Sequence, residues 1–212
     1  MSIGEDAFLN CTNLNYINLT SGNRKYKVSY GALFSIEDDH LVMLIKYPSA
    51  QGSEYSIPNG IKSIGDFAFE SSPNLTSVSI PSSVTSIGNS AFASCFSLTS
   101  ISIPNSVTSI GDSAFRSCSN LRSIYLPDSI TLIGDYAFSG CSLLENLSMP
   151  NHAQFIGGHA FEYCSRLSDI VVPVNILSIK KSTFSSCRRF THISIPNNVI
   201  SIDNYAFDGC SS

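Results

Sequence analysis

The sequence predicts an α/β solenoid, an elongated stack of short coils in which every coil repeats the same positions. Three residue types recur at one constant step of 23, namely proline from position 58 to position 196, phenylalanine from 69 to 207 and cysteine from 95 to 210. A fixed period between about 20 and 50 residues is typical of repeat architectures. Because solenoid coils contact only their neighbours, residues 1–212 are expected to form a single domain.

Each coil is predicted to contain one β-strand. Ile101 and Ile103 alternate with polar residues, which is the periodicity of a strand that turns one face to the core. Pro104 cannot donate a hydrogen bond to a neighbouring strand, so it ends the strand. Repetition of the coil then places these strands side by side in one sheet.

The second half of each coil is predicted to contain a short helical turn. Val107 and Ile110 point inward after the strand. Ala114, Phe115 and Cys118 are spaced one and four residues apart, which fits one turn of α- or 3₁₀-helix with its apolar face in the core.

The N-terminal quarter departs from this regular pattern. Residues 1–19 match a coil entered part-way, and Phe8 is expected to begin a spine of stacked phenylalanine rings. The interval from Phe8 to Phe69 is much longer than one repeat, so extra chain has been inserted between them. Within this stretch, two short apolar runs flank residues 37–40, whose sequence is typical of a hairpin turn. We interpret residues 20–57 as a β-hairpin insertion within the repeat domain.

The composition argues against nucleic-acid binding and membrane insertion. Charged residues make up 13% of the chain, about half the usual share, and the formal net charge of −4 gives no basic footprint for nucleic acid. No apolar run is long enough to span a membrane. The first residues lack the basic and apolar regions of a secretion signal.

Neither catalysis nor metal binding is predicted. The seven cysteines are widely spaced, whereas zinc sites use close pairs. Stacked parallel side chains point the same way, which favours a ladder of buried free thiols over disulfides. The four histidines have no partners at catalytic or metal-binding spacing, and no nucleotide-binding or hydrolase motif is present. We therefore expect no enzyme activity, no cofactor and no metal site.

The repeat resembles that of the BspA-like leucine-rich repeat family. The resemblance covers nearly the whole chain, and its insert resembles the hairpin island of that family. Individual coils depart from the pattern where Lys180 and Asp203 replace glycine, Ala153 replaces valine, Thr183 replaces alanine and Phe190 replaces leucine. The residues that carry the resemblance are Ile103, Pro104, Val107, Thr108, Ser109, Ile110, Gly111, Ala114, Phe115, Cys118 and Leu121, with residues 30–34 and 41–48 in the insert.

This resemblance implies a right-handed horseshoe with parallel strands on the concave face and short helical or 3₁₀ turns on the convex face. It also implies a surface or secreted protein of mucosal bacteria or parasitic protists. Members of the family are associated with adhesion to host cells and to matrix proteins such as fibronectin.

The outward face of the strands is the first candidate binding surface. The early coils carry plain serine and threonine there, whereas several later coils carry larger or charged residues. Arginine and tyrosine are the residues that most often anchor protein interfaces, although isolated exposed residues also occur on neutral surfaces. The candidate ligand-binding residues are Tyr16, Arg122, Tyr125, Glu145, Asn146, Asp169 and His192.

A basic cluster is the second candidate. It could dock an acidic glycan or protein, or it could be a solvated face balanced by Glu162 and Asp208. Its members are Arg166, Lys180, Lys181, Arg188 and Arg189.

The sequence therefore predicts a non-enzymatic protein-recognition module. We expect a cell-surface or secreted adhesin segment that binds a host matrix or cell-surface protein through the strand face. A cytoplasmic protein–protein scaffold is the alternative, favoured by the missing signal peptide and the reduced thiols. A spacer that displays another domain is the third interpretation. Core-type residues at both ends also make end-to-end self-association plausible.

Overall fold

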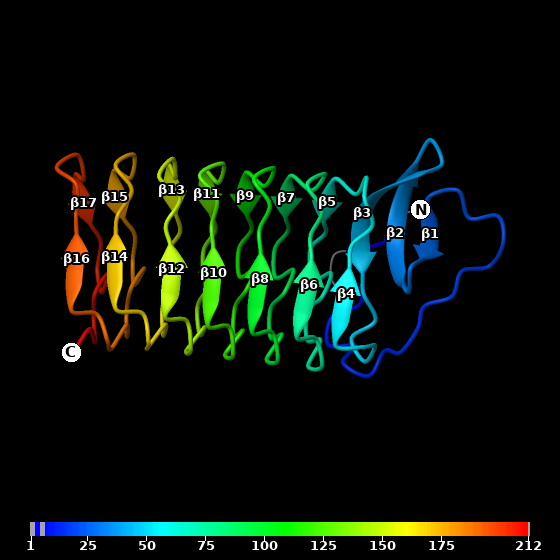
Figure 1. Ribbon diagram of the computed structural model, residues 1–212, viewed down its shortest axis with the longest axis horizontal. Helices are drawn as coiled ribbons and strands as arrows, with labels where there is room; N and C mark the ends of the chain where they lie inside the picture. The colour runs from blue at the N-terminus through cyan, green and yellow to red at the C-terminus, as the bar shows by residue number, and fades with distance from the viewer. Residues whose placement is uncertain (1–2, 5–6, 212) are drawn as a thin grey trace.

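The computed structural model describes residues 3–4 and 7–211, and this part of the chain is a β-solenoid of about seven turns. Figure 1 shows the coils standing side by side in a row, with an antiparallel meander at the N-terminal end. Each regular coil contributes one strand to each of two parallel sheets, and a row of turns closes its remaining side. The right-handed sense and the curvature of the stack stay predictions, as does the single domain over residues 1–212.

The first sheet contains the strands that the isoleucine alternation predicts. Neighbouring strands pair in parallel with a step of one repeat, so that Ser100 pairs with Ser123 and Ser123 with Asn146. We call the outward surface of this sheet the strand face. The strands are β4 (Glu54–Ser56), β6 (Ser77–Ser79), β8 (Ser100–Ser102), β10 (Ser123–Tyr125), β12 (Asn146–Ser148), β14 (Asp169–Val171) and β16 (His192–Ser194).

The second sheet was not predicted. It consists of two-residue parallel strands, in which an inward isoleucine such as Ile110 is buried and pairs with its equivalents one repeat away. The strands are β5 (Ser63–Ile64), β7 (Ser86–Ile87), β9 (Ser109–Ile110), β11 (Leu132–Ile133), β13 (Phe155–Ile156), β15 (Ser178–Ile179) and β17 (Ser201–Ile202).

The predicted helical turn is wrong: the described residues contain no helix, and residues 111–118 form a series of turns instead. Ser113 and Ser117 have φ angles of 56° and 60°, in the left-handed region, which a right-handed helix excludes. The N–H of Phe115 donates to the carbonyl of Ala137 in the next coil (2.7 Å). In a helix the Phe115 N–H would bond to a carbonyl of its own segment, and the hydrogen bond between neighbouring coils would be lost. We call residues 111–118 and their equivalents the turn wall.

Hydrogen bonds run in opposite directions on the two sides of the stack. On the turn wall, an earlier coil donates to a later one, as Phe92 N–H does to the Ala114 carbonyl (2.7 Å). Beside the second sheet, a later coil donates to an earlier one, as Gly111 N–H does to the Ile87 carbonyl (2.9 Å). The coils from β6 to β12 therefore both donate and accept backbone hydrogen bonds where they meet their neighbours in that range.

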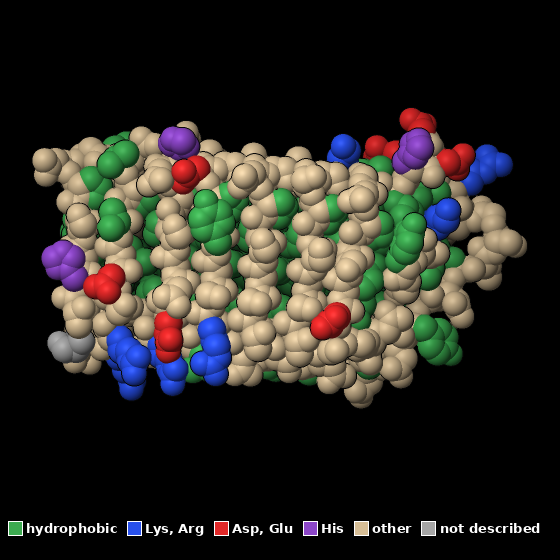
Figure 2. All heavy atoms as spheres, viewed as in Figure 1, with side chains coloured by type: hydrophobic (Ala, Val, Ile, Leu, Met, Phe, Trp, Pro, Cys, Tyr) green, Lys and Arg blue, Asp and Glu red, His purple; other side chains and the backbone are tan. Residues whose placement is uncertain are grey.

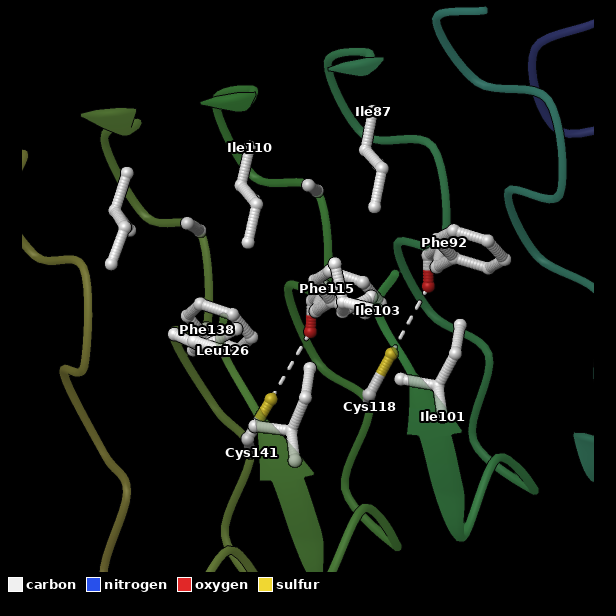
Figure 3. Close-up of a cluster of buried hydrophobic side chains, with 14 of the residues drawn as sticks. Ile87, Phe92, Ile101, Ile103, Ile110, Phe115, Cys118, Leu126, Phe138 and Cys141 are labelled. Atoms are coloured by element: carbon white, nitrogen blue, oxygen red, sulfur yellow. Dashed lines mark hydrogen bonds between the residues drawn. The ribbon is translucent and has the colours of Figure 1, made fainter. Parts of the chain in front are cut away.

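The core is built from columns of identical residues. Phenylalanine rings stack from Phe69 to Phe207; the rings of Phe92 and Phe115, for example, lie 5.1 Å apart and 5° from parallel. Beside them, the thiol of Cys118 donates to the Phe92 carbonyl (3.1 Å), and Figure 3 shows the same bond repeated one coil further on. The described cysteines are free, so the prediction of a reduced thiol ladder is confirmed.

The N-terminal end differs from the expected coil. The insert forms three antiparallel strands, β1 (Tyr26–Ser29), β2 (Ala32–Glu37) and β3 (His40–Lys46), and β3 continues the second sheet by pairing with β5. The predicted turn lies at Asp38 and Asp39, between β2 and β3. In most regular coils, the N–H of the column phenylalanine donates to an alanine carbonyl in the next coil. At this end of the stack the acceptor is the Ala68 carbonyl, and Tyr47 N–H donates to it (2.8 Å) in place of the expected Phe8 N–H.

Two further contacts show that the insert caps the stack. Lys46 is 1% exposed, and its ammonium group donates to the carbonyls of Phe67 (3.0 Å) and Glu70 (3.3 Å). The Tyr47 ring packs against Phe69 at 5.3 Å, where the spine predicted to begin at Phe8 would continue. Because the insert occupies these positions, the described part of residues 1–19 contains no strand and does not join the strand sheet.

Both parallel sheets are interrupted at the same place along the stack. The first sheet runs from β4 to β12, and β14 pairs only with β16. The second sheet ends at β13, and β15 pairs only with β17. Figure 1 shows these two C-terminal coils in the same row as the preceding coils, next to β12 and β13. We call this interruption between β12/β13 and β14/β15 the break.

Two stacking columns also end at the break. The N–H of Asp135 donates to Asp112 Oδ1 (2.8 Å), and that of Gly158 donates to Asp135 Oδ1 (2.7 Å); Gly158 has no side chain to continue this ladder. The neighbouring column of closely packed glycines reaches Gly157 and is followed by Lys180. The coil that contains β14 and β15 therefore lacks both the aspartate hydrogen bond and the close glycine packing that join the preceding coils.

Candidate functional site

The strand face is formed by the outward first and third residues of each short strand. In β6 and β8 both of these residues are serines. From β10 onward the same two columns contain Tyr125, Asn146, Asp169 and His192. Strand alternation turns these side chains to solvent while the isoleucine or leucine between them packs inward.

Four of the predicted residues meet in one shallow hollow on this face. The hollow has a volume of about 660 Å³ and spans β8 to β14, with serine rungs between the larger side chains. Tyr125 is 59% exposed, so most of its ring is available to a ligand. Tyrosine, carboxylate and amide side chains offer an apolar contact together with several hydrogen-bonding atoms. The residues in question are Tyr125, Glu145, Asn146 and Asp169.

Arg166 joins this surface through an ion pair that the sequence did not predict. Its Nη1 lies 2.7 Å from Glu145 Oε1, and both side chains are 40% exposed. The N–H of Glu145 donates to the Arg122 carbonyl (3.0 Å), which places Arg122 in the adjacent position one coil earlier. An exposed pair contributes about 0–1 kcal/mol to stability, so its main effect is to orient the two side chains.

Asp169 is held at the other side of the hollow. Its Oδ2 accepts a hydrogen bond from Ser168 Oγ (2.9 Å), and its Oδ1 lies 3.5 Å from Thr191 Oγ1. His192 pairs in register with Asp169 on the next strand. Figure 2 shows acidic and basic side chains gathered on this face over the C-terminal coils, whereas the coils before them are mostly uncharged.

Tyr16 and the members of the basic cluster other than Arg166 do not line the hollow. Tyr16 is 71% exposed in the N-terminal segment, outside the strand sheet. Lys180 and Lys181 follow β15 at the start of the turn wall, while Arg188 and Arg189 lie beyond its end, next to β16.

The buried thiols of the ladder are unsuited to nucleophilic catalysis and to metal binding. Burial raises the pKa of the Cys95 thiol to about 12, and it raises the pKa of the Cys118 and Cys141 thiols well above the ordinary value of a cysteine. The nucleophilic and metal-binding form of cysteine is the thiolate, which these pKa values disfavour. No group of three or more His, Cys, Asp or Glu residues in the described ranges could hold a metal ion. Nor does a helix there reach the length and apolarity that crossing a bilayer requires.

Solved structures with the same fold come from several bacteria. A leucine-rich repeat protein from Eubacterium ventriosum aligns with a TM-score of 0.85 and 29% identity, over 98% of this chain and 55% of its own. The Treponema pallidum leucine-rich repeat protein (T. pallidum TpLRR) aligns with a TM-score of 0.73 and 27% identity, over 88% of this chain and 86% of its own. The pneumococcal vaccine antigen PcpA aligns at 0.69 and 25% identity, over 91% and 46%.

The chain thus spans about half the length of the Eubacterium protein and of PcpA. A comparison with curated proteins finds no match. The BspA type leucine-rich repeat region, in six copies, matches residues 1–34, 47–165 and 131–212. With its regularly repeated coils, its buried phenylalanine and cysteine columns and this match over most of its length, the chain belongs to the BspA-type leucine-rich repeat family.

Proposed function

We propose that this chain is a non-enzymatic protein-recognition module that binds its ligand through the strand face. The observation that carries the proposal is the hollow of about 660 Å³ that Tyr125, Glu145, Asn146 and Asp169 line together. A tyrosine with arginines nearby is the composition that most often dominates binding energy at protein interfaces. The Arg166–Glu145 pair holds two charged side chains beside the hollow, which reduces the ordering that binding requires.

We further propose that the module acts at the cell surface as an adhesin segment, with a host matrix or cell-surface protein as its ligand. Family membership supports this assignment, and so does the similarity to PcpA, which is described as a vaccine antigen. The serine-rich coils before the hollow would then extend the stack and hold the varied residues of β10 to β16 away from its N-terminal end.

The direct test is binding of the purified chain to immobilised fibronectin and other matrix proteins. The double variant Arg122→Ala/Tyr125→Ala should weaken saturable binding at least about tenfold, because Tyr125 lines the hollow and Arg122 lies one coil before Glu145, which also lines it. The matched control Arg116→Ala/Tyr163→Ala removes the same two residue types from the turn wall and should leave binding unchanged. Equal binding by both variants would contradict a strand-face site.

End-to-end self-association is a separate proposal. Ile202 is at the core position that Ile110 occupies, yet it is 52% exposed on the last described coil. Its neighbour Ile200, at an outward position where Thr108 stands, is 82% exposed. Analytical ultracentrifugation of the wild type and of Ile200→Ser/Ile202→Ser should show association only in the wild type. A wild-type chain that stays monomeric at millimolar concentration would refute this proposal.

A further inference from the structure

The break leaves two strand edges facing each other without pairing. Before the break, Glu145 N–H donates to the Arg122 carbonyl, and after it Thr191 N–H donates to the Ser168 carbonyl (3.1 Å). No equivalent bond joins Ser168 to Glu145, and none joins β12 to β14, all of which the structure describes. Unpaired strand edges carry rows of N–H and C=O groups that can pair with another extended chain.

A hollow of about 440 Å³ lies at these edges. This volume is within the range of small-ligand pockets, roughly 300–1,000 Å³. The hollow shares Leu147, Ser148 and Asp169 with the strand-face hollow and also includes His192. One side is contributed by β12 and the residues after it, and the other by β14 and the corner that follows. The lining includes Leu147, Met149, Val171, Val172 and Val174.

Two of these lining residues interrupt polar columns. Val171 is 70% exposed, where the equivalent residues of the adjacent coils are Ser148 and Ser194. Val174 is 68% exposed, where the preceding coil has Asn151. An apolar lip beside unpaired backbone favours a ligand that supplies both backbone hydrogen bonds and an apolar side chain.

We propose that the break is a docking slot for an extended segment of a partner polypeptide, which pairs with β12 and β14 as an added strand. A segment with a polar–apolar–polar pattern fits best, because its central side chain would point inward between Leu147 and Ile170. The backbone edges carry this interaction, whereas the strand-face proposal relies on outward side chains. Because the strand-face hollow also spans β12 and β14, an added strand would change the shape of that hollow. Strand addition of this kind gives affinity through main-chain bonds and specificity through alternate side chains.

The turn wall allows the slot to widen without separating the two groups of coils. Across the break, Phe161 N–H still donates to the Thr183 carbonyl (2.8 Å), and Tyr163 N–H to that of Ser185 (2.9 Å). The rings of Phe161 and Phe184 stay stacked at 5.6 Å.

An added strand needs about 4.8 Å on each side. Among the described residues, no hydrogen bond joins β12 to β14 or β13 to β15. Bonds remain on the turn wall and in the bend before β14, where Ser165 Oγ donates to the Ser142 carbonyl (3.3 Å) and Arg166 pairs with Glu145 (2.7 Å). Rotation about the turn wall supplies the space for an added strand and separates Arg166 from Glu145.

A fluorescent peptide of residues 97–105 is a suitable probe, because it contains β8. In the protein β8 pairs in parallel with a neighbouring strand on each edge, as the docked segment would. We expect saturable binding by fluorescence anisotropy. The same peptide with methylated backbone nitrogens at Ser100, Ile101 and Ser102 should bind at least about tenfold more weakly, since its side chains are kept while its donors are lost. Equal binding of the two peptides would overturn the proposal, as would no binding at up to millimolar peptide.

A disulfide across the slot locates the binding site. Ser148→Cys/Val171→Cys should lose at least about tenfold in peptide affinity when oxidised and recover it on reduction. The control Ser79→Cys/Ser102→Cys joins strands that are already paired and should bind the peptide in both states. Recovery on reduction shows that the slot variant is folded. Undiminished binding to the oxidised slot variant would place the peptide elsewhere and refute the proposal. The Arg122→Ala/Tyr125→Ala variant should bind the peptide normally.

Discussion

Truncation of one ring in the middle of the phenylalanine column should strongly destabilise the stack. Phe115 is 0% exposed and lies between Phe92 (5.1 Å, 5°) and Phe138 (5.2 Å, 3°). Phe→Ala substitutions in cores cost about 3–5 kcal/mol, and an aromatic pair contributes about 0.5–1.5 kcal/mol of such a total. Since Phe115 loses two pairs and has no solvent-exposed side, we expect Phe115→Ala to lower the free energy of unfolding by about 4 kcal/mol.

Position along the column provides the control. Phe207 is only partly buried and lies 5.6 Å from Phe184 and 6.5 Å from Phe190, and no later ring of the column follows it in the described chain. Phe207→Ala should therefore cost about half as much as Phe115→Ala. Phe115→Leu keeps most of the buried apolar surface and loses the ring pairs, so we expect a cost of about 1–2 kcal/mol.

The assay is guanidinium unfolding followed by far-ultraviolet circular dichroism, with the slope m compared between variants. An unchanged slope would show that the free energies refer to the same transition. A cost below about 1.5 kcal/mol for Phe115→Ala, or an equal cost for Phe207→Ala, would refute the view that the central rings carry the core.

Three other outcomes follow from the same geometry. Gly134→Ala should cost about 1–3 kcal/mol in thermal or chemical unfolding, because its Cβ would lie 2.6 Å from the backbone nitrogen of Asp112; Gly158→Ala, where the nearest atom is 3.3 Å away, should cost far less. Asp112→Ala should cost about 0.5–1.5 kcal/mol by the same measurement, since it removes the acceptor of the Asp135 N–H. Burial raises the pKa of the Cys141 thiol, so unfolded chains release its proton first as the pH rises and stability should fall above about pH 8.5. Unfolding titrations from pH 7 to 10 should show this fall, with a smaller slope for Cys141→Ala; a flat profile would contradict a buried thiol.

The sequence was sufficient for the columns of the core but not for the backbone that joins them. The spacing of Ala114, Phe115 and Cys118 is the same whether those residues form a helical turn or a series of turns, because both put all three side chains inward. What separates the two is the partner of the Phe115 N–H, which is the carbonyl of Ala137 in the following coil. Local periodicity carries no information about such a distant partner, and for that reason the turn wall was mistaken for helix.

Most of the candidate site was predicted because strand alternation decides which side chains face outward. Tyr125, Asn146 and Asp169 all follow from that rule. The position of Arg166 does not follow from strand alternation. Arg166 lies in the bend before β14, and its side chain contacts Glu145 in the preceding coil. The prediction that Tyr16 lies on the strand sheet was wrong, because the insert occupies the end of the stack where that coil was expected.

The break was also beyond the reach of the sequence. Lys180 and Asp203 both replace the column glycine, yet Asp203 N–H still donates to the Ile179 carbonyl (2.9 Å) and β17 pairs with β15. A missing glycine alone therefore does not interrupt the sheets. At Lys180 the loss coincides with the end of the side-chain ladder at Gly158, and only the structure shows that Asp112 and Asp135 accept hydrogen bonds from the following coil.

The opposed hydrogen bonds of the two sides make each coil complementary to its own copy. A gene that loses or duplicates a segment encoding one whole repeat would therefore yield a protein in which every donor still meets an acceptor of the same kind. Removal of residues 59–81, for example, would shorten the stack by one coil and bring the N-terminal meander that much nearer to the hollow on the strand face. A deletion that stops one position short of a whole repeat would instead shift every later side chain out of its column. Such chains can change the reach of their binding surface in whole coils, by recombination, while the chemistry of that surface stays the same.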